Sequence, residues 1–391
     1  MINPYGSPLE QPAQIATSRR KLSIGLPAIH SDSEHRFPLT PEGAATLLER
    51  GYRVIIEAGA ADPIHYNDNA YARRGIEIAD RAAALAADVV IYTAEPQRPD
   101  IDMMRRGAML LTLMHLERWH PSAINAMLMR GIVTIALDLI TDPRGNHPFA
   151  DILAEIDGRA AIALASSLLA DSQSGKGILL GGVAGIVPCE VTIFGSGLAA
   201  IAAARSATGL GAMVRMFDND VYSLRSAIRD LGPQIIGSAC HAKVVESALR
   251  SADVVIATGG FPSTFAIDAM MVEQMKRGVL IYDLTPRAGR LFPSLPCIDL
   301  SEARQAAGID RRKVYVNPGN AVPRTAAMAL SNSLNTLLDD VMVCEGVTNA
   351  LKLTPGLRGA VLTFLGKVTN REVGRLVKCR ATDITIFLQL M

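Results

Sequence analysis

Short apolar segments alternate with helical segments along the first part of the chain. The apolar segments begin with KLSIGLPAI and continue with YRVIIEAG, DVVIYTAEP, GAMLLTLM and IVTIALDLI, which are rich in β-branched residues. Helical stretches such as DRAAALAA and PSAINAMLMRG separate them, and one helix is expected to open at Thr40 and Pro41 and to end at Gly51. This alternation is typical of βαβ units and predicts a largely parallel sheet.

The pattern changes between residues 143 and 190 and then resumes. The turn PRGNHP precedes a long Ala-rich helical pattern, EIDGRAAIALASSLLAD, which is followed by the Gly-rich loop SGKGILLGGVAG. A second alternating region contains CEVTIFGSG, AMVRMFD, ADVVIATGG and GVLIYDL, and KVYVNPGN closes it near residue 320. From Thr325 onward, AAMALSNSLNTLLDDVM and TNALKLTPGLRGAVLTFLG predict helices. We therefore expect an α/β protein with two domains.

Length and composition agree with this organisation. A chain of 391 residues has room for two or three domains at about 150 residues each. Hydrophobic residues make up 49% and charged residues 20%, which excludes global disorder. The net charge of +1 gives no support for a nucleic-acid or an anionic-membrane surface.

Cysteine spacing and hydropathy argue against disulfide-rich, metal-binding and membrane-spanning classes of protein. The five cysteines stand singly, so buried free thiols are favoured over disulfides or a metal site. No apolar run approaches the roughly 20 residues that span a bilayer. The N-terminus has no hydrophobic leader segment, and we expect a cytoplasmic protein whose residues 1–20 form a loose extension.

The strongest local motif follows the predicted strand EVTIF. Gly195, Ser196 and Gly197 precede a helix whose third position is Ala200, a glycine fingerprint of the form GxGxxA. The first glycine allows a tight turn, the second lets the backbone approach a pyrophosphate, and the small third residue allows close helix packing. The helix N-terminus also favours phosphate. The motif predicts a dinucleotide-binding Rossmann domain, with an ordinary strand–turn–helix as the alternative.

A carboxylate supports the dinucleotide interpretation and indicates which cofactor binds. Asp218 closes the next predicted strand, 21 residues after Gly197, where it would accept hydrogen bonds from the adenine ribose hydroxyls. Because a carboxylate repels a 2′-phosphate, NAD is favoured over NADP. Arg215 lies within the same strand and is expected to point away from the cofactor.

Several motifs together resemble the family of alanine dehydrogenase and the first α domain of nicotinamide nucleotide transhydrogenase. They are EHRFPLTP at 34–41, MHL at 114–116, AEIDGR at 154–159, GGVAG at 181–185, the glycine fingerprint, and NPGNAVPRT at 317–325. They occur in the family order from about residue 21 to the end. GGVAG and the VPRT segment are closer to alanine dehydrogenase.

The resemblance implies two doubly wound domains, with a Rossmann NAD-binding domain inserted into a discontinuous substrate domain. On this basis residues 21–148 and 325–391 form the substrate domain and residues 149–324 form the NAD-binding domain. The active site would lie between the two domains. The family also implies a homo-oligomer, a dimer or a hexamer.

The resemblance also implies roles for individual residues. Arg36 matches the arginine that binds the substrate carboxylate, and His115 matches the general acid and base at the reacting carbon. Asn317 falls where the family holds the nicotinamide ring. A surface arginine and a structural histidine are the alternatives for Arg36 and His115.

Two positions depart from the family pattern. Ala94 stands where the family has a lysine that contacts the substrate's carboxylate and carbonyl, and Arg287 stands where the family has an aspartate near the nicotinamide. Loss of the lysine removes a charge-assisted hydrogen bond worth about 1.5 to 3 kcal/mol. Arg287 would return a cation to the site and bind a carboxylate.

These departures leave three functional hypotheses. The first is an NAD-dependent oxidoreductase that transfers hydride between nicotinamide and an amino acid/2-keto acid pair other than simple alanine. The second is an opine-type enzyme that reductively joins a keto acid to an amino acid, with Arg287 holding the second carboxylate. The third is an NAD-binding pseudoenzyme with a regulatory role.

Overall fold

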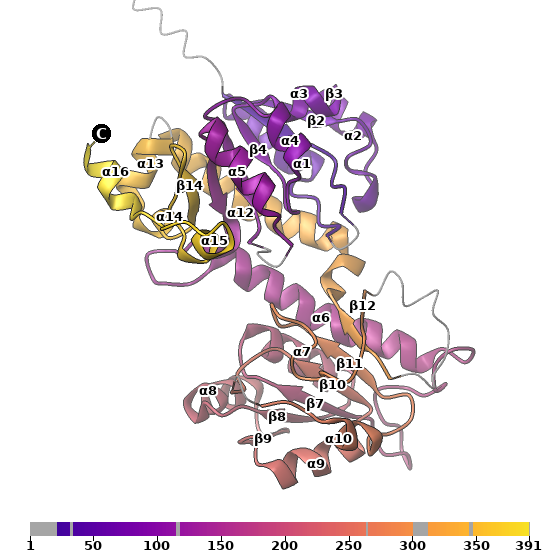
Figure 1. Cartoon of the computed structure of the whole chain (residues 1–391). Helices are drawn as coiled ribbons and strands as arrows, with labels where there is room; N and C mark the ends of the chain where they lie inside the picture. Colours follow the sequence, from indigo (N-terminus) through magenta and orange to yellow (C-terminus); the bar gives the residue numbers. More distant parts are fainter. Residues whose placement is uncertain are drawn as a thin grey trace, which may run out of the picture.

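The computed structural model describes residues 22–31, 34–114, 118–262, 265–299, 312–343 and 347–390. The predicted loose extension at residues 1–20 lies outside these ranges. Each of the two predicted α/β regions forms its own sheet, and Figure 1 shows the two sheets in separate halves of the molecule.

The first sheet is built mainly from the N-terminal part of the chain. Its strands are β1 Ser23–Leu26, β2 Arg53–Glu57, β3 Glu77–Ala79, β4 Val89–Ile91, β5 Met109–Thr112, β6 Val133–Ala136, β14 Val361–Phe364 and β15 Lys367–Val368. Within the described residues they lie in the order β15-β14-β6-β5-β4-β1-β2-β3. The pairs from β3 to β6 are parallel, whereas β14 pairs antiparallel with both β6 and β15.

Helices cover both faces of this sheet. Before the second sheet they are α1 Pro41–Glu49, α2 Asp68–Ala72, α3 Arg81–Leu85, α4 Arg98–Met103, α5 Pro121–Arg130 and α6 Pro148–Ala170, with 3₁₀ turns η1 Asp62–Ile64 and η2 Leu137–Leu139. After it come η3 Pro318–Ala321, α12 Pro323–Val343, α13 Val347–Leu353, α14 Pro355–Arg358, α15 Arg371–Leu376 and α16 Ile384–Leu390.

Alternation along the strands explains why both faces are apolar. In β4, Val89 and Ile91 join the core under α1 and α12, whereas Val90 joins the opposite core under α4 and α5. Neighbouring side chains of a strand point to opposite faces, so a strand buried on both faces is continuously apolar. The predicted helix at Pro41 is confirmed, with the Thr40 hydroxyl accepting from Gly43 N at 3.2 Å.

The second sheet has the Rossmann strand order. Its strands are β7 Glu190–Phe194, β8 Met213–Phe217, β9 Ile235–Ser238, β10 Val254–Ala257, β11 Leu280–Asp283, β12 Cys297–Asp299 and β13 Val314–Val316. Its helices are α7 Leu198–Gly209, α8 Val221–Leu231, α9 Ala242–Ser251 and α10 Ala269–Glu273. The order is β12-β13-β11-β10-β7-β8-β9, with every pair parallel among the described residues. Apart from the edge strand β12, this is the doubly wound arrangement of dinucleotide-binding domains.

Helix α6 connects the two halves (Figure 1). Its first turns place Phe149 and Leu153 in the core of the first sheet, and its later turns place Ala161 and Leu169 in the core of the second. A Cβ on Gly158 would lie only 2.2 Å from the carbonyl oxygen of Ala199, so the glycine lets α6 and α7 pack closely. The predicted fold class, two doubly wound domains with the Rossmann domain inserted, is confirmed.

Two expectations from the sequence are wrong. The segment VLTF was predicted to continue a C-terminal helix, but it forms β14, because its fully buried β-branched and aromatic side chains complete the first sheet beside β6. The thiols were expected to be buried, but Cys297 and Cys379 are exposed and only Cys189 is buried among the described cysteines, which are all free.

The described residues contain neither a candidate membrane span nor a candidate metal site. None of their helices combines the length and apolar character needed to cross a bilayer. No group of three or more His, Cys, Asp or Glu side chains among them is arranged to hold a metal ion.

Candidate active site

The switch point of each sheet carries some of the residues that the sequence predicted for the site. In the first sheet the strand order reverses between β1 and β4, and the loops after these strands carry Arg36 and Ala94. In the second sheet it reverses between β7 and β10, and the loops after these strands carry Gly197 and Gly259. Ligands of open α/β sheets bind in the crevice at such points.

The glycine loop combines one structural glycine with one open glycine. Gly195 has φ +106°, and a Cβ there would lie 2.3 Å from the Thr258 hydroxyl. Gly197 is the residue before α7, and a Cβ there would meet nothing within 4 Å. Ala200 is fully buried in the first turn of α7. The protein's own packing therefore requires a glycine at 195, whereas at 197 it leaves space above the backbone.

Asp218 lies directly beside this loop. Its carboxylate accepts the Ser196 hydroxyl at 2.6 Å and the backbone N–H of Asp220 at 2.8 Å, and only 3% of the residue is exposed. The Arg215 side chain instead forms an ion pair at 3.3 Å with Glu190, which lies at the opposite end of the sheet. Of these two side chains, only the Asp218 carboxylate therefore lies beside the glycine loop.

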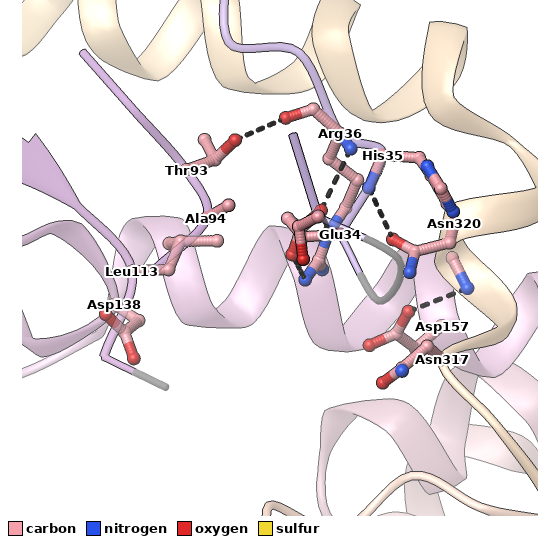
Figure 2. A network of polar contacts seen from close by, with 12 residues as sticks. Glu34, His35, Arg36, Thr93, Ala94, Leu113, Asp138, Asp157, Asn317 and Asn320 are labelled. Atoms are coloured by element: carbon pink, nitrogen blue, oxygen red, sulfur yellow. Dashed lines mark hydrogen bonds and ion pairs between the residues drawn. The ribbon is translucent and has the colours of Figure 1, made fainter. Parts of the chain in front are cut away.

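Arg36 is buried and paired within its own loop (Figure 2). Its Nε and Nη2 atoms donate to the two carboxylate oxygens of Glu34 at 2.7 and 2.5 Å, and Glu34 is completely buried. Burial by itself lowers the pKa of Arg36. The charge and hydrogen bonds of Glu34, with weaker effects of Asp157 and Asp138, outweigh burial and raise that pKa above its ordinary value. The site therefore contains a permanent cation surrounded by carboxylates.

The loop after β4 is hydrogen-bonded to the Arg36 loop. The Thr93 hydroxyl donates to the carbonyl oxygen of Arg36 at 2.6 Å, and Thr112 donates to the carbonyl oxygen of Ala94 at 3.1 Å. Ala94 is fully buried, and Figure 2 shows it on the same side of the network as Leu113 and Thr93. Position 94, for which the family resemblance implies a lysine, thus lies beside the Arg36 loop and carries only a methyl group.

A third set of contacts joins the Arg36 loop and α6 to the segment that follows β13 of the second sheet. The backbone N–H of His35 donates to the Asn320 side chain at 3.4 Å, and Gly319 N donates to Asp157 at 3.0 Å. Asn317 has a left-handed backbone (φ +51°), and its amide donates to Asp299 at 3.2 Å. Asparagine tolerates this conformation better than most residues. Asp157 thereby faces both Arg36 and the segment that carries Asn317 (Figure 2).

Arg287 lies in the second domain, in the segment after β11. With Thr285, Arg290 and Gly259 it lines a cavity of 330 Å³ beside the ends of β10 and β11. Burial raises the pKa of neighbouring Asp283, although hydrogen bonds from Thr285 and Gly289 oppose the rise. The structure therefore places Arg287 at the same edge of the sheet as the glycine loop.

Three carboxylates near Arg36 have no role predicted from the sequence. Glu34, Asp138 and Asp157 all raise the pKa of Arg36. Of these three, only Glu34 had a signal in the sequence, because it lies two residues before Arg36. His115, the predicted general acid and base, lies outside the described residues. The preceding residue is fixed, because Met114 N donates to Asp138 at 2.9 Å.

Comparison with known proteins agrees with this arrangement. Residues 25–156 match the family described as "Alanine dehydrogenase/PNT, N-terminal domain", and residues 161–371 match its C-terminal domain. The chain is 30% identical over 370 residues to an alanine dehydrogenase of Mycolicibacterium smegmatis, covering 93% of this chain and 99% of the relative.

Solved structures show the same fold. An L-alanine dehydrogenase superposes with a TM-score of 0.78 at 26% identity, covering 91% of this chain and 99% of that one. A transhydrogenase from Sinorhizobium meliloti superposes with a TM-score of 0.71 at 22% identity, covering 89% and 99%.

The fold and the paired switch-point sites define an alanine dehydrogenase-like oxidoreductase with a Rossmann domain. The chain belongs to the alanine dehydrogenase/PNT family, as its motifs predicted. This membership agrees with NAD as the cofactor that the glycine fingerprint and Asp218 indicated.

Proposed function

We propose that this protein is an NAD-dependent oxidoreductase that transfers a hydride between nicotinamide and an amino acid/2-keto acid pair other than alanine. The observation that carries the proposal is the buried Arg36 guanidinium at the switch point of the first sheet, with the side chain of Ala94 in place of a second cation. The first feature provides a site for a substrate carboxylate. The second changes which substrate is bound well.

The residues around the glycine loop fit NAD. The open space at Gly197 suits the approach of a pyrophosphate, and the α7 N-terminus provides backbone N–H groups. Asp218 would exchange its hydrogen bond from Ser196 for the ribose hydroxyls, and its charge disfavours a 2′-phosphate. Asn317 would hold the nicotinamide ring, and Gly195 and Ala200 maintain the loop and its helix. Bound NAD supplies the group that accepts or returns the hydride.

On the substrate side, each residue has one task. Arg36 would bind the carboxylate with its remaining N–H groups, while Glu34 holds the guanidinium in place. His115 would move the proton at the reacting carbon, because an imidazole titrates near neutral pH. Holding the carboxylate and the base in fixed positions accounts for much of the rate enhancement in such reactions.

The charges in the site argue against alanine as the natural substrate. Glu34 neutralises Arg36, and Asp138 and Asp157 add negative charge. A lysine at position 94 would offset this excess and contact the carboxylate, but Ala94 provides neither. A substrate with further polar or charged groups is therefore needed to recover the lost binding energy.

Arg287 favours a second candidate, an opine-type condensation of a keto acid with an amino acid. The cavity that it lines with Arg290 has the positive charge to hold the second carboxylate of such a product. In this reaction the imine formed from the two substrates would be reduced at the same nicotinamide position. The Arg36 site would keep its role in both candidates.

The experiment has two stages. Titration of NADH by fluorescence should show saturable binding, which NADPH does not match. A panel of amino acids, keto acids with ammonium, and keto acid/amino acid pairs is then followed at the NADH absorbance, with Arg36→Ala and His115→Ala as variants. We expect turnover with at least one acidic or polar pair, a higher KM for Arg36→Ala, and a turnover roughly 100-fold lower for His115→Ala. NADH binding without turnover of any pair would instead support a pseudoenzyme.

A further inference from the structure

A large concavity outside the Arg36 network lies in the C-terminal part of the chain. It has a volume of 1120 Å³ and extends between the ends of β5 and β6, at Met114 and Leu139, and the segment that includes α15 and α16. Figure 1 shows α14, α15 and α16 grouped on one side of the first sheet. A cavity of this size is slightly above the usual range for small-molecule sites, about 300 to 1,000 Å³.

Arginines dominate the charge of this cavity. Four guanidinium groups line it, from Arg358, Arg371, Arg375 and Arg380, and we call it the C-terminal arginine cavity. The carboxylates in its lining are Glu372 and Asp383, so four positive charges against two negative ones leave a net charge of +2. The whole chain has a net charge of only +1, so this is a local concentration of positive charge.

The carboxylates do not neutralise the arginines. No ion pair or side-chain hydrogen bond joins Arg371, Arg375 or Arg380 to any of the described residues, whereas most exposed ion pairs elsewhere involve arginine. Asp383 uses one carboxylate oxygen to accept the backbone N–H of Thr385 at 2.8 Å, at the start of α16. Three guanidinium groups are thus available to a ligand.

Arg358 gives the cavity a fixed cation. This half-buried side chain donates from Nε to the carbonyl oxygen of Leu351 at 2.7 Å and from Nη2 to that of Lys352. These carbonyl oxygens orient the guanidinium but carry no formal charge. A half-buried cation held only by neutral acceptors retains its attraction for an anion.

The segments that carry the arginines are themselves held by hydrogen bonds. Asn370 accepts from Glu372 N at 2.9 Å and Val373 N at 3.2 Å before α15, and Thr382 N donates to Val368 in β15 at 2.8 Å. Arg371 and Arg375 lie four residues apart in α15, which places them on one face of the helix. The backbone that carries the arginines is therefore held in place, and their side chains line one cavity.

We propose that the C-terminal arginine cavity binds a small polyanion, a compact molecule with two or more carboxylate or phosphate groups. The cavity volume favours a small molecule over a nucleic acid or a membrane, which would bind a flat or extended basic surface. Met114 and Leu139 directly follow Leu113 and Asp138 in the chain, so a bound anion would lie near the strand ends that face the candidate active site. The proposal does not depend on the proposed function.

Isothermal titration calorimetry with citrate and with inorganic diphosphate tests this site, with acetate as the monoanion control. We expect both polyanions or one of them to bind, and the double variant Arg375→Gln/Arg380→Gln to weaken that binding by at least about 10-fold. The matched control, Arg73→Gln/Arg277→Gln, removes the same charge from two exposed arginines elsewhere and should bind as the wild type does.

The outcomes separate the alternatives. Binding of citrate alone identifies a carboxylate ligand, and binding of diphosphate alone identifies a phosphate ligand. Equal binding by the wild type and the cavity variant would overturn the proposal, because the anion would then lie elsewhere, for example at the glycine loop. Equal weakening in both double variants, or binding of a short oligonucleotide but of neither small polyanion, would also overturn it. Circular dichroism verifies folding, and Arg375→Lys should retain most of the affinity.

Discussion

At the scale of single residues, Glu34 determines how much of the Arg36 charge a ligand can use. The sequence motif contained both residues and led to the role proposed for Arg36, but it did not show their pairing. It depends on the turn that brings a fully buried carboxylate onto Nε and Nη2 of Arg36. The sequence also did not predict that Asp138 and Asp157 lie near Arg36, because both are distant from Arg36 in the chain.

Replacing Glu34 with Gln tests this pairing. The variant leaves a buried guanidinium without its counter-ion, so we expect a loss of stability of about 1.5 to 3 kcal/mol. Added pyruvate should then raise the melting temperature of Glu34→Gln more than that of the wild type, because its carboxylate can take the place of Glu34. Thermal unfolding with and without pyruvate measures both effects. Equal shifts in the two proteins would show that Glu34 does not limit the binding of a carboxylate to Arg36.

Gly197 provides a second test at this scale. A Cβ at this position would meet no protein atom within 4 Å, but a side chain there would occupy the space proposed for the pyrophosphate. Gly197→Val should therefore fold with nearly wild-type stability and lose NADH binding, as measured by fluorescence titration. Gly195→Val is the contrasting variant, since its side chain would clash with Thr258, and it should be destabilised. Wild-type NADH affinity in Gly197→Val would refute this position of the cofactor.

At the scale of elements, the sequence was informative where local patterns decide the structure. The β-branched apolar runs predicted β1, β2, β4, β5 and β6 of the first sheet and β7, β8, β10, β11 and β13 of the second, but not the short strands β3, β9, β12 and β15. Pro41 with Thr40 marked the start of α1. β14 was missed because its pairing partner, β6, lies more than 200 residues away in the chain. The arrangement of β14 against β6 is a property of the tertiary structure, which no local pattern contains.

The contact between α6 and α7 leads to a prediction about helix packing. A Cβ on Gly158 would lie 2.2 Å from a backbone oxygen of α7, so Gly158→Ala should cost about 1–3 kcal/mol of unfolding free energy. Gly209→Ala is the matched control, because a Cβ at the end of α7 meets nothing within 4 Å. Denaturant unfolding of both variants measures the difference. Similar stabilities would show that the helices separate at little cost.

Asp253 gives a pH-dependent prediction for the second sheet. Just before β10 it accepts hydrogen bonds from Lys276 at 2.8 Å, from Lys176 at 3.1 Å and from the backbone of Glu190 at 3.2 Å. Burial tends to raise the pKa of Asp253, but these hydrogen bonds outweigh it and lower the pKa below the ordinary value. The stabilisation is therefore present above the unfolded-state pKa of about 4 and is lost as the pH falls through the lower folded-state value.

Asp253→Asn should accordingly lower stability at pH 7, by about 1.5 to 3 kcal/mol. The difference from the wild type should shrink as the pH falls below about 4. Urea unfolding at a series of pH values measures it. A difference that stays constant down to pH 3 would contradict the assignment.

At the scale of the whole molecule, two doubly wound sheets each place a site at their switch point, and α6 together with the segment 317–323 joins them. The sequence predicted this division and the glycine loop, because their signals are local. It also identified Ala94 and Arg287 as departures from the family, but only the structure showed that Ala94 is buried beside the Arg36 loop whereas Arg287 lines a cavity in the other domain. The two substitutions therefore act on different sides of the proposed reaction.

The most direct test of the proposed function is the rate of alanine-dependent NAD reduction by the wild type and by Ala94→Lys/Arg287→Asp, measured as kcat/KM. If the two departures changed the substrate, the wild type should oxidise alanine at least about 10-fold less efficiently than the double variant, since the restored lysine contributes one charge-assisted hydrogen bond. The wild type should be more efficient with another pair in the substrate panel. Efficient alanine oxidation by the wild type, unaffected by Arg287→Ala, would contradict the proposal that this site acts on a substrate other than alanine.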